Sequence, residues 1–131
     1  METTVLERFL RYIAVDTQSE DEKEAIPSTQ KQFDLARMLA DELREMGAED
    51  VRLDEHAYVY GSIPATTDKS VPVLGLIAHM DTAPAFSGTG VRPQIIRGYD
   101  GGDILMNPET GLTLSPAAYP EMLRYKGQDL I

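Results

Sequence analysis

A histidine and an aspartate two residues apart form the pair in this sequence whose chemistry is easiest to state. His79 and Asp81 directly follow an apolar run at residues 71–78, and Pro84 comes three residues after the aspartate. The run has the length and composition of a strand that is buried on both faces. In open α/β sheets, functional groups lie just beyond the carboxyl ends of strands. The sequence therefore predicts that this pair lies at a strand end where a site can form.

The spacing of the pair suits an imidazole that binds a metal. If one ring nitrogen of His79 binds zinc, the other can donate to Asp81, which fixes the tautomer and the ring orientation. Pro84 stops the strand from continuing. A histidine at a strand end followed by a turn aspartate is also common without any metal, so the pattern by itself leaves both interpretations open.

The remaining polar features are weaker candidates. His56 lies between two short predicted strands, and we expect it in an exposed turn rather than among metal ligands. The acidic run at residues 20–24 is expected to be a solvated loop. A glycine-containing loop at residues 85–90 should border the His79 pocket, but it lacks the residue order of a phosphate-binding loop.

The composition limits the classes of protein to which this chain can belong. The chain has 131 residues, which corresponds to one domain or part of one, with 42% hydrophobic and 26% charged residues. It has no cysteine and a net charge of −10. The lack of cysteine fits a reducing cytoplasm, and the negative charge argues against nucleic acid or an anionic membrane as a partner. The sequence shows neither a run of transmembrane length nor a signal-peptide pattern.

Two helices are predicted near the start of the chain. The first should run from Thr4 to about Ala14, because Thr4 and Glu7 have capping-box spacing. The second should begin near Ser28 or Thr29 and end before Gly47. Apolar residues recur at helical spacing in both, at Val5, Leu6, Phe9, Leu10 and Ile13 in the first and at Phe33, Ala36, Leu39, Ala40, Leu43 and Met46 in the second.

Short strands are predicted in the rest of the chain, at residues 51–53, 58–63, 94–96, 103–106 and 112–114, with the last two forming a hairpin. A helix is expected within residues 116–126, with Met122, Leu123 and Tyr119 facing inward, and a further strand begins at residues 127–131. The predicted fold class is α/β, with helices packed on a mixed β-sheet. The order of elements does not make a closed layered domain.

The pair at the strand end also belongs to a longer pattern. His79, Asp81 and Pro84 stand at the positions of H-x-D-x-x-P, and the segment resembles this signature of the M20 family of co-catalytic zinc peptidases. Further segments resemble the peptidase T group of that family, the tripeptide aminopeptidases, at residues 16–19, 26–29, 86–88, 93–96, 99–104, 114–116 and 127–131. Ala85 departs from the pattern, since the group tends to carry aspartate there. The departure concerns the rim of the pocket rather than the metal.

The resemblance implies a cytoplasmic zinc exopeptidase that releases the N-terminal residue from tripeptides and holds two zinc ions per full-length enzyme. It implies that His79 binds one zinc and that Asp81 is the catalytic-site carboxylate that orients His79. It also implies that residues 1–131 are the N-terminal part of a zinc-exopeptidase-like catalytic domain, without the lid or dimerisation domain. Small peptides are then the expected partners, nucleic acid and membranes are not, and a homo-oligomer is compatible with the family.

A two-zinc hydrolase needs a bridging carboxylate, terminal ligands for each metal and a general base. The family places these further along the chain than the residues matched here. We therefore expect residues 1–131 alone to be inactive and unable to hold zinc. Two alternatives stay open: another M20 activity, such as a dipeptidase or an N-acyl amino acid deacylase, and a non-catalytic binding or packing domain.

Overall fold

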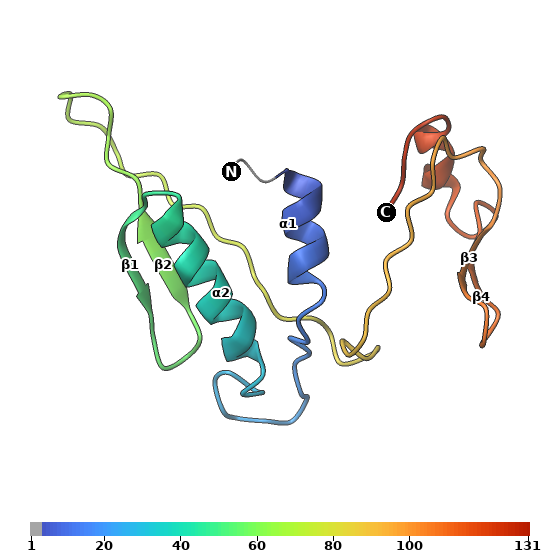
Figure 1. Cartoon of the computed structure of the whole chain (residues 1–131), viewed down its shortest axis with the longest axis horizontal. Coiled ribbons are helices and arrows are strands. Elements are labelled where there is room, and N and C mark those ends of the chain that lie inside the picture. The colour runs from blue at the N-terminus through green and yellow to red at the C-terminus, as the bar shows by residue number, and fades with distance from the viewer. Residues whose placement is uncertain (1–3) are drawn as a thin grey trace. The chain divides into compact units, whose positions relative to one another are not determined.

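The computed structural model describes residues 4–131, and it divides into two compact units, one ending at Val91 and one spanning Arg92–Ile131. The first unit contains helices α1 (Val5–Tyr12) and α2 (Gln32–Glu45) and strands β1 (Glu49–Leu53) and β2 (Val59–Ser62) (Figure 1). The second contains strands β3 (Ile104–Asn107) and β4 (Leu112–Leu114) and the 3-10 helix η1 (Pro120–Tyr125). Within residues 4–131, no helix is both long enough and apolar enough to cross a membrane.

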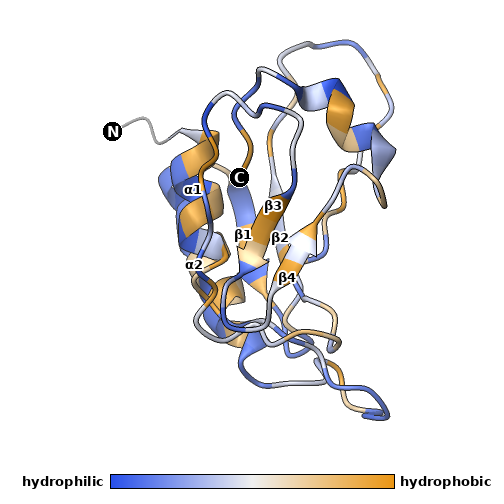
Figure 2. Ribbon diagram, turned by 90° about the vertical axis from the view of Figure 1, so that its right-hand side faces the viewer, coloured by the Kyte–Doolittle hydropathy of each residue, from blue (hydrophilic) through white to orange (hydrophobic). Residues whose placement is uncertain are grey.

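Helix α1 begins with the predicted capping box. The Glu7 backbone N–H donates to Thr4 Oγ1 at 3.2 Å, and the Thr4 backbone N–H donates to Glu7 Oε2 at 2.7 Å. The helix ends at Tyr12, two residues before the predicted end. Its apolar side is only half covered: Leu6 and Leu10 are partly buried, whereas Val5 and Phe9 are exposed. Helix α1 therefore carries both polar and apolar residues around its axis, as the blue and orange in Figure 2 show.

Helix α2 starts at Gln32, later than the predicted start near Ser28 or Thr29, and its N-cap residue Lys31 makes no side-chain capping bond. The Thr29 hydroxyl instead donates to the backbone carbonyl of Gln18 at 2.8 Å. The predicted end is confirmed, because Gly47 adopts φ 84°, the left-handed conformation that ends helices. Leu35, Ala36 and Ala40 are buried, where α2 contacts β1 and β2. Met46, predicted inward, is exposed.

Strands β1 and β2 form an antiparallel hairpin, with Arg52 opposite Tyr60 and Leu53 opposite Val59. Asp54 organises the turn between them, since its Oδ1 accepts from the backbone N–H groups of His56 at 3.0 Å and Tyr58 at 2.9 Å. His56 is exposed in this turn, as predicted.

The second unit is built on the predicted hairpin of β3 and β4, in which Ile104 lies opposite Leu114. Its small core consists of Tyr99, Ile104 and Met122, with Ile96, Leu114 and Leu130 packed against it. The helix predicted over residues 116–126 is only the 3-10 helix η1, which begins at Pro120. A helix that began at residue 116 would place Pro120 in its interior, where the missing N–H and the ring disfavour it. Tyr119 and Leu123 are half-exposed, contrary to expectation. The strands predicted at residues 94–96 and 127–131 reduce to one bridge, between Ile96 and Leu130.

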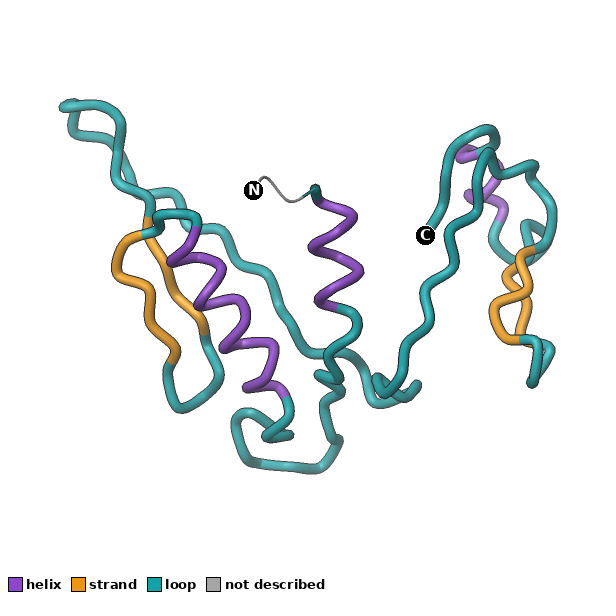
Figure 3. The backbone as a smooth tube through the Cα atoms, in the orientation of Figure 1, coloured by secondary structure: helices purple, strands orange, loops and turns teal. Residues whose placement is uncertain are grey.

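The central strand predicted at residues 71–78 is wrong for this chain. These residues form no strand, as the loop colouring between β2 and β3 in Figure 3 shows. Val73 is 98% exposed and Ile77 is 100% exposed. A strand buried on both faces is stabilised by its neighbours, and within residues 4–131 no strand pairs with this run.

The α/β class itself is confirmed: α2 packs on the β1–β2 hairpin, and besides the antiparallel hairpins there is one parallel bridge, between Gln18 and Thr82.

Candidate functional site

The structure brings the His79 and Asp81 side chains together. His79 Nδ1 lies 2.9 Å from the backbone oxygen of Asp81 and 3.3 Å from Asp81 Oδ1. Both oxygens are acceptors, so the geometry favours a proton on Nδ1 and leaves the lone pair on Nε2. The imidazole is 85% exposed. The free nitrogen is therefore accessible for a further ligand.

The backbone around Asp81 is held by the segment that follows α1, residues 16–19, which crosses it in Figure 1. Thr17 Oγ1 donates to the Met80 carbonyl at 2.8 Å, and the Thr82 N–H donates to the Thr17 carbonyl at 3.3 Å. The Ser19 N–H donates to the Thr82 carbonyl at 2.9 Å. Thr17 is only 2% exposed. Polar groups on both sides of Asp81 are therefore satisfied by residues more than sixty positions earlier in the chain.

The same segment also holds the loop that follows Pro84. Gln18 Nε2 donates to two backbone oxygens, of Pro84 at 3.0 Å and of Phe86 at 2.9 Å. Ala85, the departure from the family pattern, lies between these two residues. One side-chain amide therefore sets the path of the chain on either side of Ala85.

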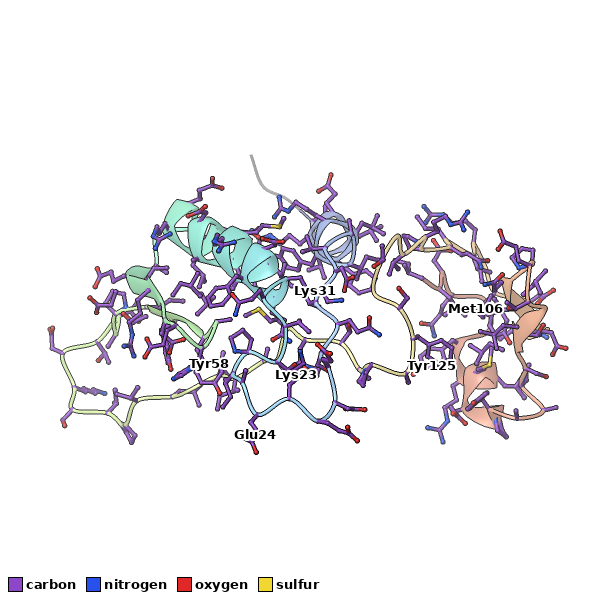
Figure 4. All side chains as sticks on the ribbon, turned by 90° about the horizontal axis from the view of Figure 1, so that it is seen from below. Lys23, Glu24, Lys31, Tyr58, Met106 and Tyr125 are labelled. Atoms are coloured by element: carbon purple, nitrogen blue, oxygen red, sulfur yellow. The ribbon has the colours of Figure 1, made fainter. Side chains whose placement is uncertain are left out.

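Asp16 connects this loop to α2. Its Oδ2 accepts from Thr89 Oγ1 at 2.6 Å, and its Oδ1 lies 2.9 Å from the ammonium of Lys31, which Figure 4 labels. The hydrogen bond from Thr89, followed by those from Lys31 and the Gln18 backbone, lowers the pKa of Asp16 to about 2. The carboxylate is therefore charged throughout the neutral range.

The described residues do not contain a complete metal site. Among residues 4–131, no three histidine, cysteine, aspartate or glutamate side chains are close enough together to share an ion. Asp100 and Asp103 make hydrogen bonds within the second unit. Asp100 Oδ1 accepts from the Gly102 N–H, and Asp103 Oδ1 accepts from the Ser115 hydroxyl. A zinc site takes at least three protein ligands. The described residues therefore offer one accessible imidazole at this place, His79, and no complete set of zinc ligands.

Sequence reasoning missed the buried carboxylate of Glu42, which is 8% exposed on α2. Its Oε1 lies 3.0 Å from Arg8 Nε and 2.7 Å from Arg11 Nη2, and its Oε2 accepts a hydrogen bond from the Tyr12 hydroxyl. Burial by itself raises the pKa of this carboxyl, but the hydrogen bonds from Tyr12 and Arg11 lower the pKa of Glu42 below its ordinary value. A glutamate between the apolar positions Leu39 and Leu43, with two arginines on one face of the preceding helix, was the available signal. The cluster joins α1 to α2 and lies outside the His79 pair.

Comparison with curated proteins finds close relatives along the chain, whereas no family model matches it. It is 56% identical over 129 residues to peptidase T of Desulfitobacterium hafniense strain Y51, covering 98% of this chain and 31% of that protein. It is 54% identical over 131 residues to peptidase T of Geobacillus thermodenitrificans, covering 100% of this chain and 32% of that protein. Peptidase T of Bacillus velezensis is 50% identical over the same number of residues. The chain thus spans about a third of the length of these relatives, and at this identity over its whole length it belongs to the peptidase T family.

Proposed function

We propose that this chain supplies part of the catalytic domain of a zinc-dependent aminopeptidase that releases the N-terminal residue from tripeptides in the cytoplasm. The observation that carries the proposal is the His79–Asp81 pair, in which Nδ1 is occupied by Asp81 and Nε2 is exposed. A histidine held in this way is the usual form of a zinc ligand, because the partner of the other nitrogen sets the tautomer and orientation. His79 is thus the proposed zinc ligand, and Asp81 orients it.

When bound, zinc acts as a Lewis acid on a peptide carbonyl. The contribution of this chain is one imidazole, kept in one tautomer by Asp81 and presented on an exposed loop. Since the residues described supply only this one ligand, the further ligands and the general base must come from outside them. Residues 1–131 alone are accordingly proposed to be inactive.

A chimera tests the proposal. This chain replaces the matching segment of the Desulfitobacterium hafniense relative, and the zinc-loaded protein is assayed on tripeptides, dipeptides and N-acyl amino acids. We expect release of the N-terminal residue from tripeptides, and loss of at least about a thousandfold in kcat/KM in His79→Ala, of the order seen when a core catalytic group is removed. His56→Ala is the matched control and should keep full activity, since His56 lies in the β1–β2 turn and its backbone N–H donates to Asp54.

Two results would contradict the proposal. Turnover that survives in His79→Ala would remove His79 from the zinc site. A chimera that prefers dipeptides or N-acyl amino acids would assign the chain to a different activity of the same kind of hydrolase.

A further inference from the structure

We propose that Thr17 and Gln18 are positioning residues for the His79–Asp81 pair, acting through the backbone on either side of Asp81. The inference rests on the proposed function for its catalytic meaning, and on the hydrogen bonds of residues 16–19 for its physical content. Among residues 4–131, the hydrogen bonds of both side chains go to backbone carbonyls and not to His79. Their effect on the pair is transmitted by the peptide groups that they hold.

The first step of the argument is the pairing on both sides of Asp81. The Thr17 hydroxyl holds the carbonyl of Met80, and the Thr17 carbonyl holds the N–H of Thr82. These two groups flank Asp81, so they limit the rotation of the peptide planes that direct its side chain and its carbonyl. The side chain and the carbonyl of Asp81 are the two groups that face His79 Nδ1.

The second step is the lack of other support before the pair. Residues 71–78 form no strand in the described chain, so the approach to His79 is not fixed by a sheet. The conformation of the loop around His79 therefore depends mainly on the hydrogen bonds that follow His79 in the chain. Thr17 is 2% exposed, and its hydroxyl bond is shielded from competition by water.

The third step concerns Gln18, which continues the support along the loop. Its amide donates to the carbonyls of Pro84 and Phe86, and its own carbonyl accepts from the Thr29 hydroxyl. The amide thus keeps the turn after Pro84 closed, and the bond from Thr29 ties Gln18 to the segment that leads into α2. Together the two residues hold the chain from Met80 to Phe86.

A purely structural role predicts something different from a positioning role. Loss of a structural bond lowers the stability of the protein and leaves the chemistry of the folded form unchanged. Loss of a positioning bond changes the tautomer of His79 and lowers kcat more than it raises KM. A variant that restores only the hydroxyl should then restore both the tautomer of His79 and kcat.

The test compares Thr17→Val, which removes the hydroxyl at constant shape, with Thr17→Ser, which keeps it. Gln18→Met removes the amide donors at similar length. The matched controls are Thr66→Val and Gln30→Met, which alter exposed residues. Long-range proton–nitrogen NMR of the imidazoles in the 131-residue chain reports the tautomer of His79, and His56 serves as the internal control.

We expect the Nδ1–H form of His79 in the unsubstituted chain and in Thr17→Ser, and a mixture of tautomers in Thr17→Val and Gln18→Met. In the chimera, Thr17→Val should lower kcat about tenfold to a hundredfold, the scale of a small misplacement of a catalytic group, with KM changed less than about threefold. The controls and the His56 signals should not change.

The inference is overturned if Thr17→Val keeps both the tautomer and kcat, or if Thr17→Ser is as impaired as Thr17→Val. A tautomer change in Thr17→Val together with an inactive unsubstituted chimera would support the positioning of the pair and refute the proposed function. The two claims are thereby tested separately.

Discussion

Gly88 lies against the carboxylate of Asp16 so closely that a Cβ atom on Gly88 would come within 2.6 Å of Asp16 Oδ1. That oxygen is already engaged by Lys31 and by the Gln18 backbone, and the other oxygen is engaged by Thr89. The approach of the glycine backbone therefore allows the loop around Thr89 to close onto the segment after α1.

Gly88→Ala should open this contact. The added methyl group forces the carboxylate of Asp16 to rotate away from Lys31 or Thr89, at a cost of about 1–3 kcal/mol, which is typical of overpacking. Chemical denaturation of the 131-residue chain measures the change. Gly75→Ala is the matched control, because a Cβ there meets nothing within 4 Å. Equal midpoints for the two variants would contradict the expected crowding.

Asp16 should make stability sensitive to acid. Its pKa falls from an ordinary 3.8 to about 2 in the folded chain, so folding favours the charged form. The stabilisation is complete above about pH 4 and is lost as the pH falls toward 2, because the unfolded chain takes up the proton first. Asp16→Asn should make the denaturation midpoint depend less steeply on pH between pH 4 and pH 2. Asp68→Asn, on an exposed loop, should leave the steepness unchanged.

Glu42→Gln should loosen α1. The substitution leaves Arg8 and Arg11 facing a neutral amide, and removing one partner of a fully buried pair costs about 3–5 kcal/mol. Both arginines are partly exposed, so we expect about 1–2 kcal/mol, together with faster amide hydrogen exchange in α1. The exposed Glu45 on the same helix provides the control Glu45→Gln. Unchanged exchange in α1 would show that apolar packing alone holds the helix.

The 131-residue chain should not retain zinc after dialysis. Its described residues offer one accessible imidazole in the candidate site and no group of three donors. Elemental analysis in trace-metal-free buffer is expected to give far less than one zinc per chain. Stoichiometric zinc that is lost in His56→Asn would instead implicate a histidine that the structure places in an exposed turn.

The apolar run at residues 71–78 should cause self-association. Its aliphatic side chains, among them Val73, Leu76 and Ile77, are exposed, and apolar side chains exposed together in one segment drive association. Ile77→Lys should lower the concentration dependence of the elution volume in size-exclusion chromatography. Ile63→Lys makes the same exchange at an exposed isoleucine outside the run and is expected to have a smaller effect. Monomeric elution of the unsubstituted chain at all concentrations would contradict this prediction.

Features that depend on a few neighbouring residues were determined by the sequence itself. The capping box of Thr4 and Glu7, the helix end at Gly47 and the β3–β4 hairpin all form between residues close in the chain, so their residue types are sufficient. The closeness of His79 and Asp81 is local in the same sense, because only one residue separates them. The family resemblance was also readable, since motif order needs no tertiary structure.

Only the tertiary structure decided the features that join distant segments. Thr17 is separated in sequence from its partner Met80 by 63 positions, and Glu42 from Tyr12 by 30. No local sequence pattern therefore predicts either contact. The run at residues 71–78 shows the reverse case: its composition favours a buried strand, but a strand forms only where another strand pairs with it. Within residues 4–131 no strand pairs with it, and the same side chains therefore face solvent.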